Sequence, residues 1–226
     1  MRRELSRKPT LANPLPFLRG WSRNPVAVGW PFATSYWTAR RLALATLAAA
    51  VPGDGHVLEL GPGTGPTTQA LIELGCPAAR IVVVERDGEL CRLLERRFAG
   101  LCVVQGDALR LREVLGRAGI GRACAVLSGL PMRTVAPADA ARCYRDAFRA
   151  MPPGGAIIQY TYGFRPSVDP DAGGLKLEAT FLGREWRNMP PMAIWRYRLP
   201  AHHGNRAGDN AARTMPAGPA HGRAIP

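Results

Sequence analysis

The chain of 226 residues carries 30 lysine and arginine residues against 17 aspartate and glutamate residues, which gives a net charge of +13. This length is sufficient for one well-buried core, and no interior stretch has the composition of a linker between two domains. The five cysteines are scattered without a CxxC pair, which argues against a disulfide framework and a zinc site. No run of eighteen apolar residues is present and the N-terminus lacks a signal-peptide pattern, so we expect a cytoplasmic protein without a transmembrane helix.

The basic charge is concentrated at the N-terminus, where residues 1–41 contain eight basic side chains and one acidic side chain. Such an excess predicts a polyanionic partner, either nucleic acid or an anionic membrane surface. The stretch "PLPFLRGWSRNP" mixes bulky apolar residues with arginine, the composition of a short amphipathic helix that lies in a membrane interface. We therefore predict a membrane-binding segment at residues 1–30.

The first predicted helix of the folded domain spans Ser35–Ala50, with Ser35 as its N-cap and Pro52 after its end. From about residue 55, short apolar runs alternate with amphipathic stretches, which is typical of a parallel α/β sheet buried on both faces. The predicted strands are His56–Leu60, Ile81–Glu85, Cys102–Gln105, Ala123–Ser128 and Ala156–Thr161. The helices predicted between them are Thr67–Leu74, Gly88–Phe98 and Pro137–Met151.

After Thr161 the alternation changes to two strand-like runs, Leu175–Leu182 and Met192–Leu199, which we interpret as an antiparallel hairpin at the sheet edge. The tail at residues 201–226 is rich in Gly, Ala and Pro, so we predict that it is disordered. The expected fold is therefore α/β: a doubly wound, Rossmann-like sheet of seven strands in a domain at residues 31–200.

The stretch "VLELGPGTG" places an acid, Glu59, two residues before a glycine-rich turn that follows the first strand. A phosphate-binding P-loop would require Gly-Lys-Ser/Thr, which is absent, and the dinucleotide fingerprint would require glycine in place of Pro66. Glu59 can accept hydrogen bonds from a ligand ammonium group. Glu85 ends the second strand, where an acid reaches ribose hydroxyls, and Asp107 follows the third strand, where it can accept from an adenine amine. Amine, ribose and adenine together indicate S-adenosylmethionine.

With these motifs the sequence resembles the seven-stranded, Rossmann-like S-adenosylmethionine-dependent methyltransferases from about Ser35 to Leu199. The resemblance implies S-adenosylmethionine as the cofactor, with S-adenosylhomocysteine as its product, and no metal. The residues expected to bind the cofactor are Glu59, Gly61, Pro62, Gly63, Gly65, Glu85, Arg86, Gly106, Asp107, Ala108, Ser128 and Leu130.

The stretch after the fourth strand, "LSGLPMRT", bears on the methyl acceptor. The rRNA adenine dimethylases, which the sequence also resembles, carry Asn/Asp-Leu-Pro-Tyr/Phe there to hold and stack a flipped adenine. This chain has Gly129 and Met132 at those two positions, so both base-handling side chains are missing. An RNA adenine N6-methyltransferase therefore remains the second interpretation, and a non-catalytic binding module that keeps the fold as a scaffold is the third.

The pattern "SGLP", with "FLRGWSRNPVAVG", "QYTYG" and "NMPPMAIWRYR", is similar to bacterial phospholipid N-methyltransferases of the dimethylase-like class. This resemblance implies stepwise methylation of phosphatidylethanolamine to its monomethyl and dimethyl forms and phosphatidylcholine, at the inner face of the cell membrane. It implies a phospholipid substrate and no obligate protein partner, and it makes nucleic acid an unexpected partner. One departure is "WPFATSYW", where relatives have a small "PSS"-like segment.

Methyl transfer to an amine is an in-line displacement, so the protein mainly aligns the nitrogen with the cofactor methyl group. Tyr160 and Tyr162 end the fifth strand, where aromatic faces can hold a methylated ammonium. Tyr36 begins the helix that we expect to cover the cofactor. Arg133 and Arg165 lie in loops at the same sheet edge and are the candidates for binding the lipid phosphate.

Overall fold

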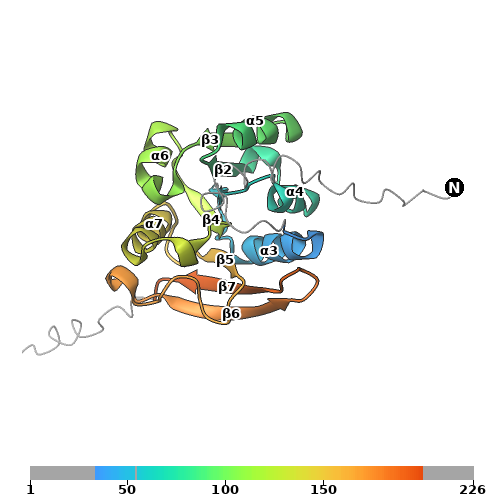
Figure 1. Cartoon of the computed structure of the whole chain (residues 1–226). Helices are drawn as coiled ribbons and strands as arrows, with labels where there is room; N and C mark the ends of the chain where they lie inside the picture. The colour runs from blue at the N-terminus through green and yellow to red at the C-terminus, as the bar shows by residue number, and fades with distance from the viewer. Residues whose placement is uncertain (1–33, 54, 201–226) are drawn as a thin grey trace, which may run out of the picture.

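The structure is a computed structural model that describes residues 34–53 and 55–200. One sheet of seven strands runs through it in the order β3-β2-β1-β4-β5-β7-β6 (Figure 1). The first five strands are parallel, and β7 pairs antiparallel with both β5 and β6. The strands are β1 (His56–Leu60), β2 (Ile81–Glu85), β3 (Cys102–Gln105), β4 (Ala123–Ser128), β5 (Ile157–Thr161), β6 (Glu178–Glu185) and β7 (Met192–Arg198). This arrangement confirms the predicted Rossmann-like sheet and its C-terminal hairpin.

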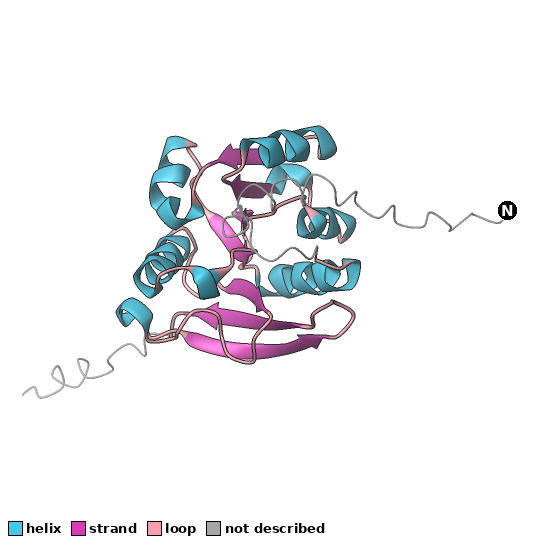
Figure 2. Cartoon of the chain, in the orientation of Figure 1, coloured by secondary structure: helices cyan, strands magenta, loops and turns pink. Residues whose placement is uncertain are grey.

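Helices cover both faces of the sheet, as a doubly wound fold requires (Figure 2). On one face lie α3 (Tyr36–Ala49), α4 (Pro66–Glu73) and α5 (Gly88–Arg97), and on the other lie α6 (Leu111–Arg117) and α7 (Pro137–Arg149). Short 3-10 turns join these elements at Ala78–Arg80, Ala108–Arg110, Met132–Thr134 and Ala172–Gly174. No helix within the described ranges is long and apolar enough to cross a membrane.

The core is divided by the sheet, because successive side chains of a strand point to opposite faces. Val57 and Val83 join the apolar cluster beneath α4 and α5. Leu58 and Val82 join the larger cluster beneath α6 and α7. Strands buried on both faces carry continuous apolar runs, which explains why the sequence predicts their bounds closely.

The hairpin strands differ from their predicted bounds: β6 ends at Glu185, three residues after the predicted Leu182, and β7 ends at Arg198, one residue before the predicted Leu199. Strand β6 begins at Glu178, three residues after the predicted start at Leu175, because Ala172–Gly174 form a 3-10 turn that Leu175 caps. The pairing of β6 with β7 also shifts register between Phe181 and Gly183. The predicted amphipathic helix and membrane-binding segment at residues 1–30 and the predicted disordered tail at residues 201–226 lie outside the described residues.

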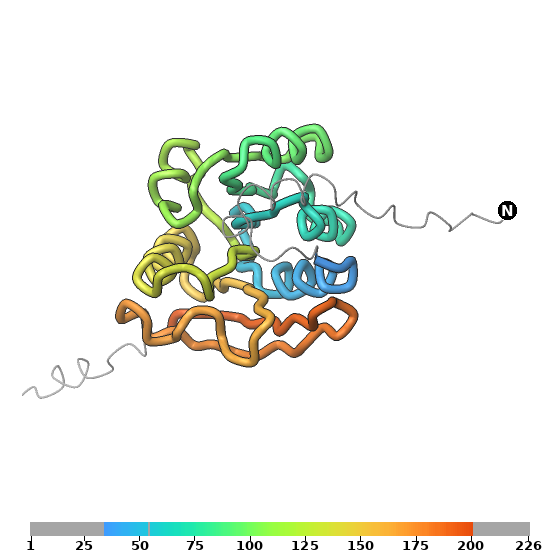
Figure 3. Tube along the Cα trace, viewed as in Figure 1, coloured from blue at the N-terminus to red at the C-terminus, as the bar shows by residue number. Residues whose placement is uncertain are grey.

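The turn between β6 and β7 is tied to the start of α3. Asn188 Oδ1 accepts hydrogen bonds from the Ser35 backbone N–H at 2.8 Å and from Thr38 Oγ1 at 3.2 Å. Ser35 is the N-cap of α3, as predicted, because its hydroxyl accepts a hydrogen bond from the Thr38 N–H. Figure 3 shows the start of α3, in blue, beside this turn. Residues far apart in the sequence therefore meet at the edge of the sheet where the parallel strands end.

Candidate active site

The loop after β1 contains three glycines whose backbones require glycine. Gly61, Gly63 and Gly65 have φ angles of 67°, 58° and 81°, in the left-handed region that side chains disfavour. A Cβ at Gly61 would lie 2.8 Å from Leu130 Cδ2, and one at Gly65 would lie 2.7 Å from the Phe98 ring. A Cβ at Gly63 would meet nothing within 4 Å. Gly61 and Gly65 therefore allow neighbouring side chains to pack against the loop backbone, whereas Gly63 borders open space that a ligand can approach. Pro62 lies between Gly61 and Gly63.

Glu85 at the end of β2 connects this loop to the next one. Its Oε2 accepts from the Gly63 N–H at 3.2 Å, and its Oε1 accepts from the N–H groups of Arg86 at 2.8 Å and Asp87 at 3.0 Å. The carboxylate is thus fixed beside Gly63, at the carboxyl ends of two neighbouring strands. The geometry fits the predicted contact with ribose hydroxyls, because an ionised carboxylate has several acceptor sites.

Glu59 is almost completely buried, with 1% of its surface exposed. Its Oε2 accepts a hydrogen bond of 2.6 Å from Thr68 Oγ1 on α4. Burial raises the pKa of Glu59 to about 7, opposed by the Thr68 hydrogen bond and assisted by the charge of Glu85. A buried carboxylate without a cationic partner is costly, and the ammonium group of a bound cofactor would relieve that cost.

The turn after β3 places Gly106, Asp107 and Ala108 at the same edge. The Gly106 N–H donates to the Glu85 carbonyl oxygen at 2.8 Å, and a Cβ at Gly106 would lie 2.7 Å from Val114. Asp107 Oδ1 accepts from the Leu109 N–H at 2.9 Å and caps the following 3-10 turn. Asp107 therefore has a structural role here, and its contact with adenine stays a prediction.

The loop after β4 lies against the loop after β1. The Gly129 N–H donates to the Leu60 carbonyl oxygen at 2.7 Å, and a Cβ at Gly129 would lie only 2.5 Å from the Gly61 carbonyl oxygen. No side chain fits at residue 129 unless one of these loops moves. The buried Ser128 hydroxyl at the end of β4 has no hydrogen-bond partner among the described residues, which makes it an unsatisfied polar group at this edge.

The two predicted tyrosines are together and next to this loop. The ring centroids of Tyr160 and Tyr162 are 6.2 Å apart with an interplanar angle of 82°, and Tyr160 OH donates to the Gly129 carbonyl oxygen at 3.3 Å. Burial raises the pKa of both hydroxyls, so both stay protonated at neutral pH. The charge of Glu59 adds to the rise in the pKa of Tyr160.

The remaining predicted acceptor residues are less closely gathered. The guanidinium of Arg133 lies against Gly163, because a Cβ there would be 2.9 Å from Arg133 Nη1. Arg165 is exposed on the loop after β5. Tyr36 is 41% exposed in the first turn of α3 and packs edge-to-face on Trp37. Arg133 thus lies beside the segment that contains Tyr160 and Tyr162, whereas Tyr36 and Arg165 are exposed and have no such contact among the described residues.

Sequence reasoning missed the arginines of the hairpin. Arg184 Nη2 donates to the Gly163 carbonyl oxygen at 3.3 Å, and Arg184 stacks on the ring of Phe164 at 4.4 Å. Arg41 from α3 donates to the carbonyl oxygens of Arg184 at 2.6 Å and Leu182 at 3.0 Å. The signal was present in "GREWRN", where arginine and tryptophan are close together on a hairpin turn.

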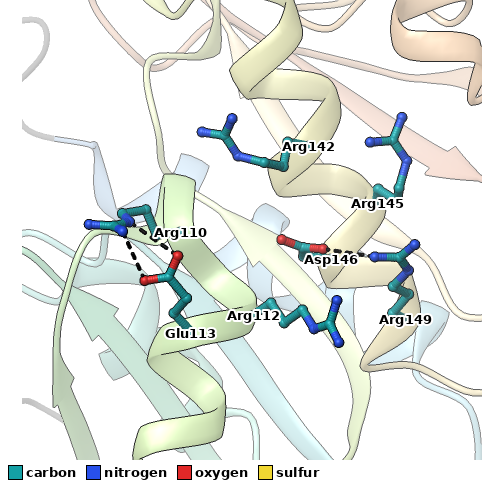
Figure 4. Close-up of a pocket in the computed structure, with 7 residues that line it drawn as sticks. All are labelled: Arg110, Arg112, Glu113, Arg142, Arg145, Asp146 and Arg149. Atoms are coloured by element: carbon teal, nitrogen blue, oxygen red, sulfur yellow. Dashed lines mark hydrogen bonds and ion pairs between the residues drawn. The ribbon is translucent and has the colours of Figure 1, made fainter.

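A strongly charged hollow of about 570 Å³ lies elsewhere, over α6 and α7 (Figure 4), which cover the opposite face of the sheet from α3 and α4 (Figure 1). Five arginines and two acids line it: Arg110, Arg112, Arg142, Arg145, Arg149, Glu113 and Asp146. Two of its arginines pair with its acids, Arg110 with Glu113 at 3.1 Å and Arg149 with Asp146 at 3.5 Å. It contains none of the predicted site residues, so we place the chemistry at the strand ends instead.

No cluster of three or more metal-ligating side chains occurs in residues 34–53 and 55–200. The described site is built from carboxylates, backbone N–H groups and aromatic rings. Those groups suit an organic cofactor with ammonium and hydroxyl groups.

Comparison with known proteins agrees with this geometry. No model of a known protein family matches the chain. The chain is 34% identical over 195 residues to the ornithine lipid N-methyltransferase of Singulisphaera acidiphila, a match that covers 79% of this chain and 92% of that protein. A match to the ribosomal RNA small subunit methyltransferase A of a Synechococcus species is 52% identical but covers only 24% of this chain and 20% of that enzyme. The solved TehB-like SAM-dependent methyltransferase of Corynebacterium glutamicum shares the fold with a TM-score of 0.54 and 16% identity, over 83% of this chain and 98% of that one.

Proposed function

The chain belongs to the class I S-adenosylmethionine-dependent methyltransferases, and from this premise we propose that it methylates the amine of a phospholipid headgroup. The proposed substrate is phosphatidylethanolamine, converted stepwise to its monomethyl and dimethyl forms and to phosphatidylcholine at the cytoplasmic surface of the cell membrane. Support for a lipid acceptor comes from the similarity to an ornithine lipid N-methyltransferase over nearly its whole length. The observation that carries the proposal is the pair Tyr160 and Tyr162, because Tyr160 is hydrogen-bonded to Gly129, which packs against the glycine-rich loop after β1.

The residues at the strand ends fit S-adenosylmethionine, whose sulfonium supplies an electrophilic methyl group. Glu59 offers a buried carboxylate to the ammonium group of the methionine part. Gly63 allows close approach to the backbone, and Glu85 beside it accepts from ribose hydroxyls. Since Glu59 and Glu85 lie near the ends of the neighbouring strands β1 and β2 and Gly63 lies in the loop after β1, one elongated ligand can contact all three.

Tyr160 and Tyr162 orient the acceptor amine rather than deprotonate it. Their hydroxyls have raised pKa values, so neither is an effective proton acceptor near neutral pH. An aromatic face stabilises the positive charge that develops on the nitrogen by about 0.5–2 kcal/mol. Only the neutral amine has a lone pair for the attack, so the headgroup ammonium first gives its proton to water or to the lipid phosphate. The tyrosine pair then stabilises the positive charge that methyl transfer creates.

Arg133 is proposed to bind the phosphate of the lipid headgroup. Its guanidinium lies against Gly163, the residue that follows Tyr162. In phosphatidylethanolamine a two-carbon ethanolamine chain separates phosphate from nitrogen. A cation close to the aromatic pair therefore suits such a headgroup, and Arg165, on the loop after β5 that contains Gly163, offers a second cation.

The proposal disfavours adenine in RNA on steric grounds. In the enzymes that methylate rRNA adenine, a polar side chain stands at the position of Gly129, but here a Cβ would collide with the Gly61 carbonyl oxygen. The aromatic residue of that motif is replaced by Met132, which is buried in the core with 2% exposure. Neither residue can hold or stack a flipped base.

The test is transfer of labelled methyl groups from S-adenosylmethionine to three acceptors supplied separately. The acceptors are vesicles of phosphatidylethanolamine with anionic lipid, vesicles of ornithine lipid with the same anionic lipid, and ribosomal RNA. We expect label in the monomethyl, dimethyl and choline lipids of the first sample and none in RNA. Label confined to ornithine lipid would contradict the proposed substrate, and label in RNA alone would contradict the lipid proposal altogether. Glu59→Gln serves as the control that lacks the carboxylate for the cofactor.

A further inference from the structure

Exposed apolar side chains gather at one edge of the molecule. Eight large hydrophobic side chains are exposed within the described residues, and five of them lie around the start of α3, the loop after β5 and the turn between β6 and β7. We call this group the aromatic rim. Its members and their exposed fractions are Tyr36 (41%), Trp37 (47%), Phe164 (84%), Trp186 (73%) and Met189 (79%). Such a patch on a folded domain marks a contact surface.

Specific contacts hold the rim in place. The Arg184 guanidinium carbon is 4.4 Å from the centroid of the Phe164 ring and 5.8 Å from that of the Trp186 ring. The Arg187 guanidinium carbon is 4.3 Å from the centroid of the Trp37 ring. Together with the two hydrogen bonds that Asn188 makes to the start of α3, these contacts join three chain segments into one surface.

The charge at the rim is positive. Arg184 and Arg187 stack on its rings, and Arg133 adjoins Gly163 on the same side. Glu185, an acid at the end of β6, is buried with 5% exposure, and its carboxylate lies 3.0 Å from Arg187 and 3.9 Å from Arg41. Tryptophan and tyrosine favour the headgroup region of a bilayer, and arginine favours its phosphates. The rim therefore complements an anionic lipid surface.

The rim also borders the proposed acceptor site. Arg184 Nη2 donates to the carbonyl oxygen of Gly163, which directly follows Tyr162. The rim and the tyrosine pair both lie where the parallel strands end, since β7 begins opposite the end of β5 at Thr161. A bilayer seated on the rim would present its headgroup amines to Tyr160 and Tyr162.

We propose that the aromatic rim, which is formed by residues outside the basic segment at residues 1–30, is a membrane-docking surface for an anionic phospholipid bilayer. The assignment rests on the proposed function in that a docked bilayer supplies the acceptor lipid. It explains why exposed aromatic residues and arginines occur on the hairpin beside the acceptor site. The rim positions the protein, whereas the chemistry remains at the strand ends.

The test is flotation of the full chain with vesicles of phosphatidylcholine and phosphatidylglycerol, which contain no amine acceptor. We expect the double variant Trp186→Ser and Met189→Ser to bind these vesicles at least about tenfold more weakly than the parent protein, since interfacial binding scales with inserted apolar area. The matched control is Leu44→Ser, which changes an exposed leucine of α3 outside the rim and should bind as the parent does.

Cofactor affinity, melting temperature and oligomeric state of the double variant are measured as well, so that membrane docking is tested separately from lipid methylation. The double variant should retain parent-like cofactor affinity and the parent melting temperature. Unchanged vesicle binding would overturn the docking surface, and so would a fall in melting temperature without a loss of binding, because the rim would then be packed against the chain itself. A dimer that dissociates in the double variant would also overturn it, by making a second copy the partner. Weaker vesicle binding of the variant supports the docking surface even if no lipid is methylated, an outcome that would contradict the proposed function alone.

Discussion

The two ends of the sheet present different kinds of site. In the parallel half, from β3 to β4, the proposed cofactor site consists of glycine backbone and of carboxylates held in place by hydrogen bonds, such as Glu85. In the antiparallel half, formed by β5, β7 and β6, they are rings and guanidinium groups near the surface. The parallel half requires an exact backbone, whereas the exposed side chains of the turn between β6 and β7, such as Trp186 and Met189, can change without disturbing the core. We therefore expect the proposed cofactor site to depend on backbone conformation and the proposed acceptor site to depend on exchangeable side chains.

The largest expected effect comes from placing a side chain in the parallel half at Gly129. Gly129→Asn puts a Cβ 2.5 Å from the Gly61 carbonyl oxygen, so the glycine loop must move. We expect methyl transfer to fall by more than about 100-fold and stability to fall by about 1–3 kcal/mol, the usual cost of overpacking. Activity assays and urea unfolding measure the two effects. Gly121→Asn is the matched control because its Cβ would meet nothing within 4 Å. RNA adenine methylation by Gly129→Asn would contradict the argument that a side chain at residue 129 cannot fit beside the Gly61 carbonyl oxygen.

Glu59→Gln separates binding from stability within the same half. Loss of the carboxylate should weaken S-adenosylmethionine binding by about 10–100-fold, as expected when a charged hydrogen bond is lost. At pH 8 the free variant should be more stable than the parent, because a buried charge has been removed. Calorimetric titration and urea unfolding test the pair of effects. Equal cofactor affinity in variant and parent would show that Glu59 does not bind the ammonium group.

The raised pKa of Glu59 gives these effects a defined pH dependence. Below the ordinary pKa of 4.5 the residue is protonated in both folded and unfolded chains; between 4.5 and about 7 only the folded chain keeps the proton. Its contribution to stability therefore falls as pH rises through this window, by up to about 3 kcal/mol, and is constant above it. Cofactor affinity should rise over the same window. Urea unfolding and calorimetric titration of the parent and of Glu59→Gln, each at pH 5.5 and 8, measure both effects. A difference between the two proteins in unfolding free energy and in cofactor affinity that did not change with pH would contradict this assignment.

A smaller effect is expected in the antiparallel half from Tyr160. Tyr160→Ala removes a ring that stabilises the developing charge, so kcat for the lipid should fall by about 2–30-fold, the equivalent of 0.5–2 kcal/mol. Tyr160→Phe keeps the ring and loses the hydrogen bond to the Gly129 carbonyl oxygen, and should retain most of the activity. Cofactor affinity should be unchanged in both. A Phe variant as inactive as the Ala variant would assign the effect to the hydroxyl instead of the ring.

The smallest effect is expected from the hollow over α6 and α7. Arg112→Ser and Arg145→Ser in that hollow should change lipid methylation and vesicle binding by less than about twofold, because the hollow contains none of the predicted site residues. The same assays applied to Arg184→Ser provide the comparison at the rim. A larger loss at the hollow than at Arg184 would relocate the anionic surface to that face.

The sequence predicts the parallel half well and the antiparallel half less completely. All four strands from β3 to β4 have the predicted bounds, because their apolar runs are followed directly by turn residues: Gly61, Arg86-Asp87, Gly106 and Gly129. Helix α6 was not predicted, since its seven residues are too few to show periodicity. The close approach at Gly129 depends on the register that sets Leu60 opposite Ser128, which local sequence does not determine. The rim likewise depends on the contact between Asn188 and Ser35, separated by 153 positions.

The most direct test of a lipid amine acceptor is mass spectrometry of membrane lipids from bacterial cells that make phosphatidylethanolamine but do not methylate it. Cells that express the full chain should accumulate ethanolamine lipids heavier by one, two and three methyl substitutions. Cells that express Glu59→Gln at the same level should accumulate far less. Unaltered ethanolamine lipids in cells that contain folded, cofactor-binding protein would contradict the account.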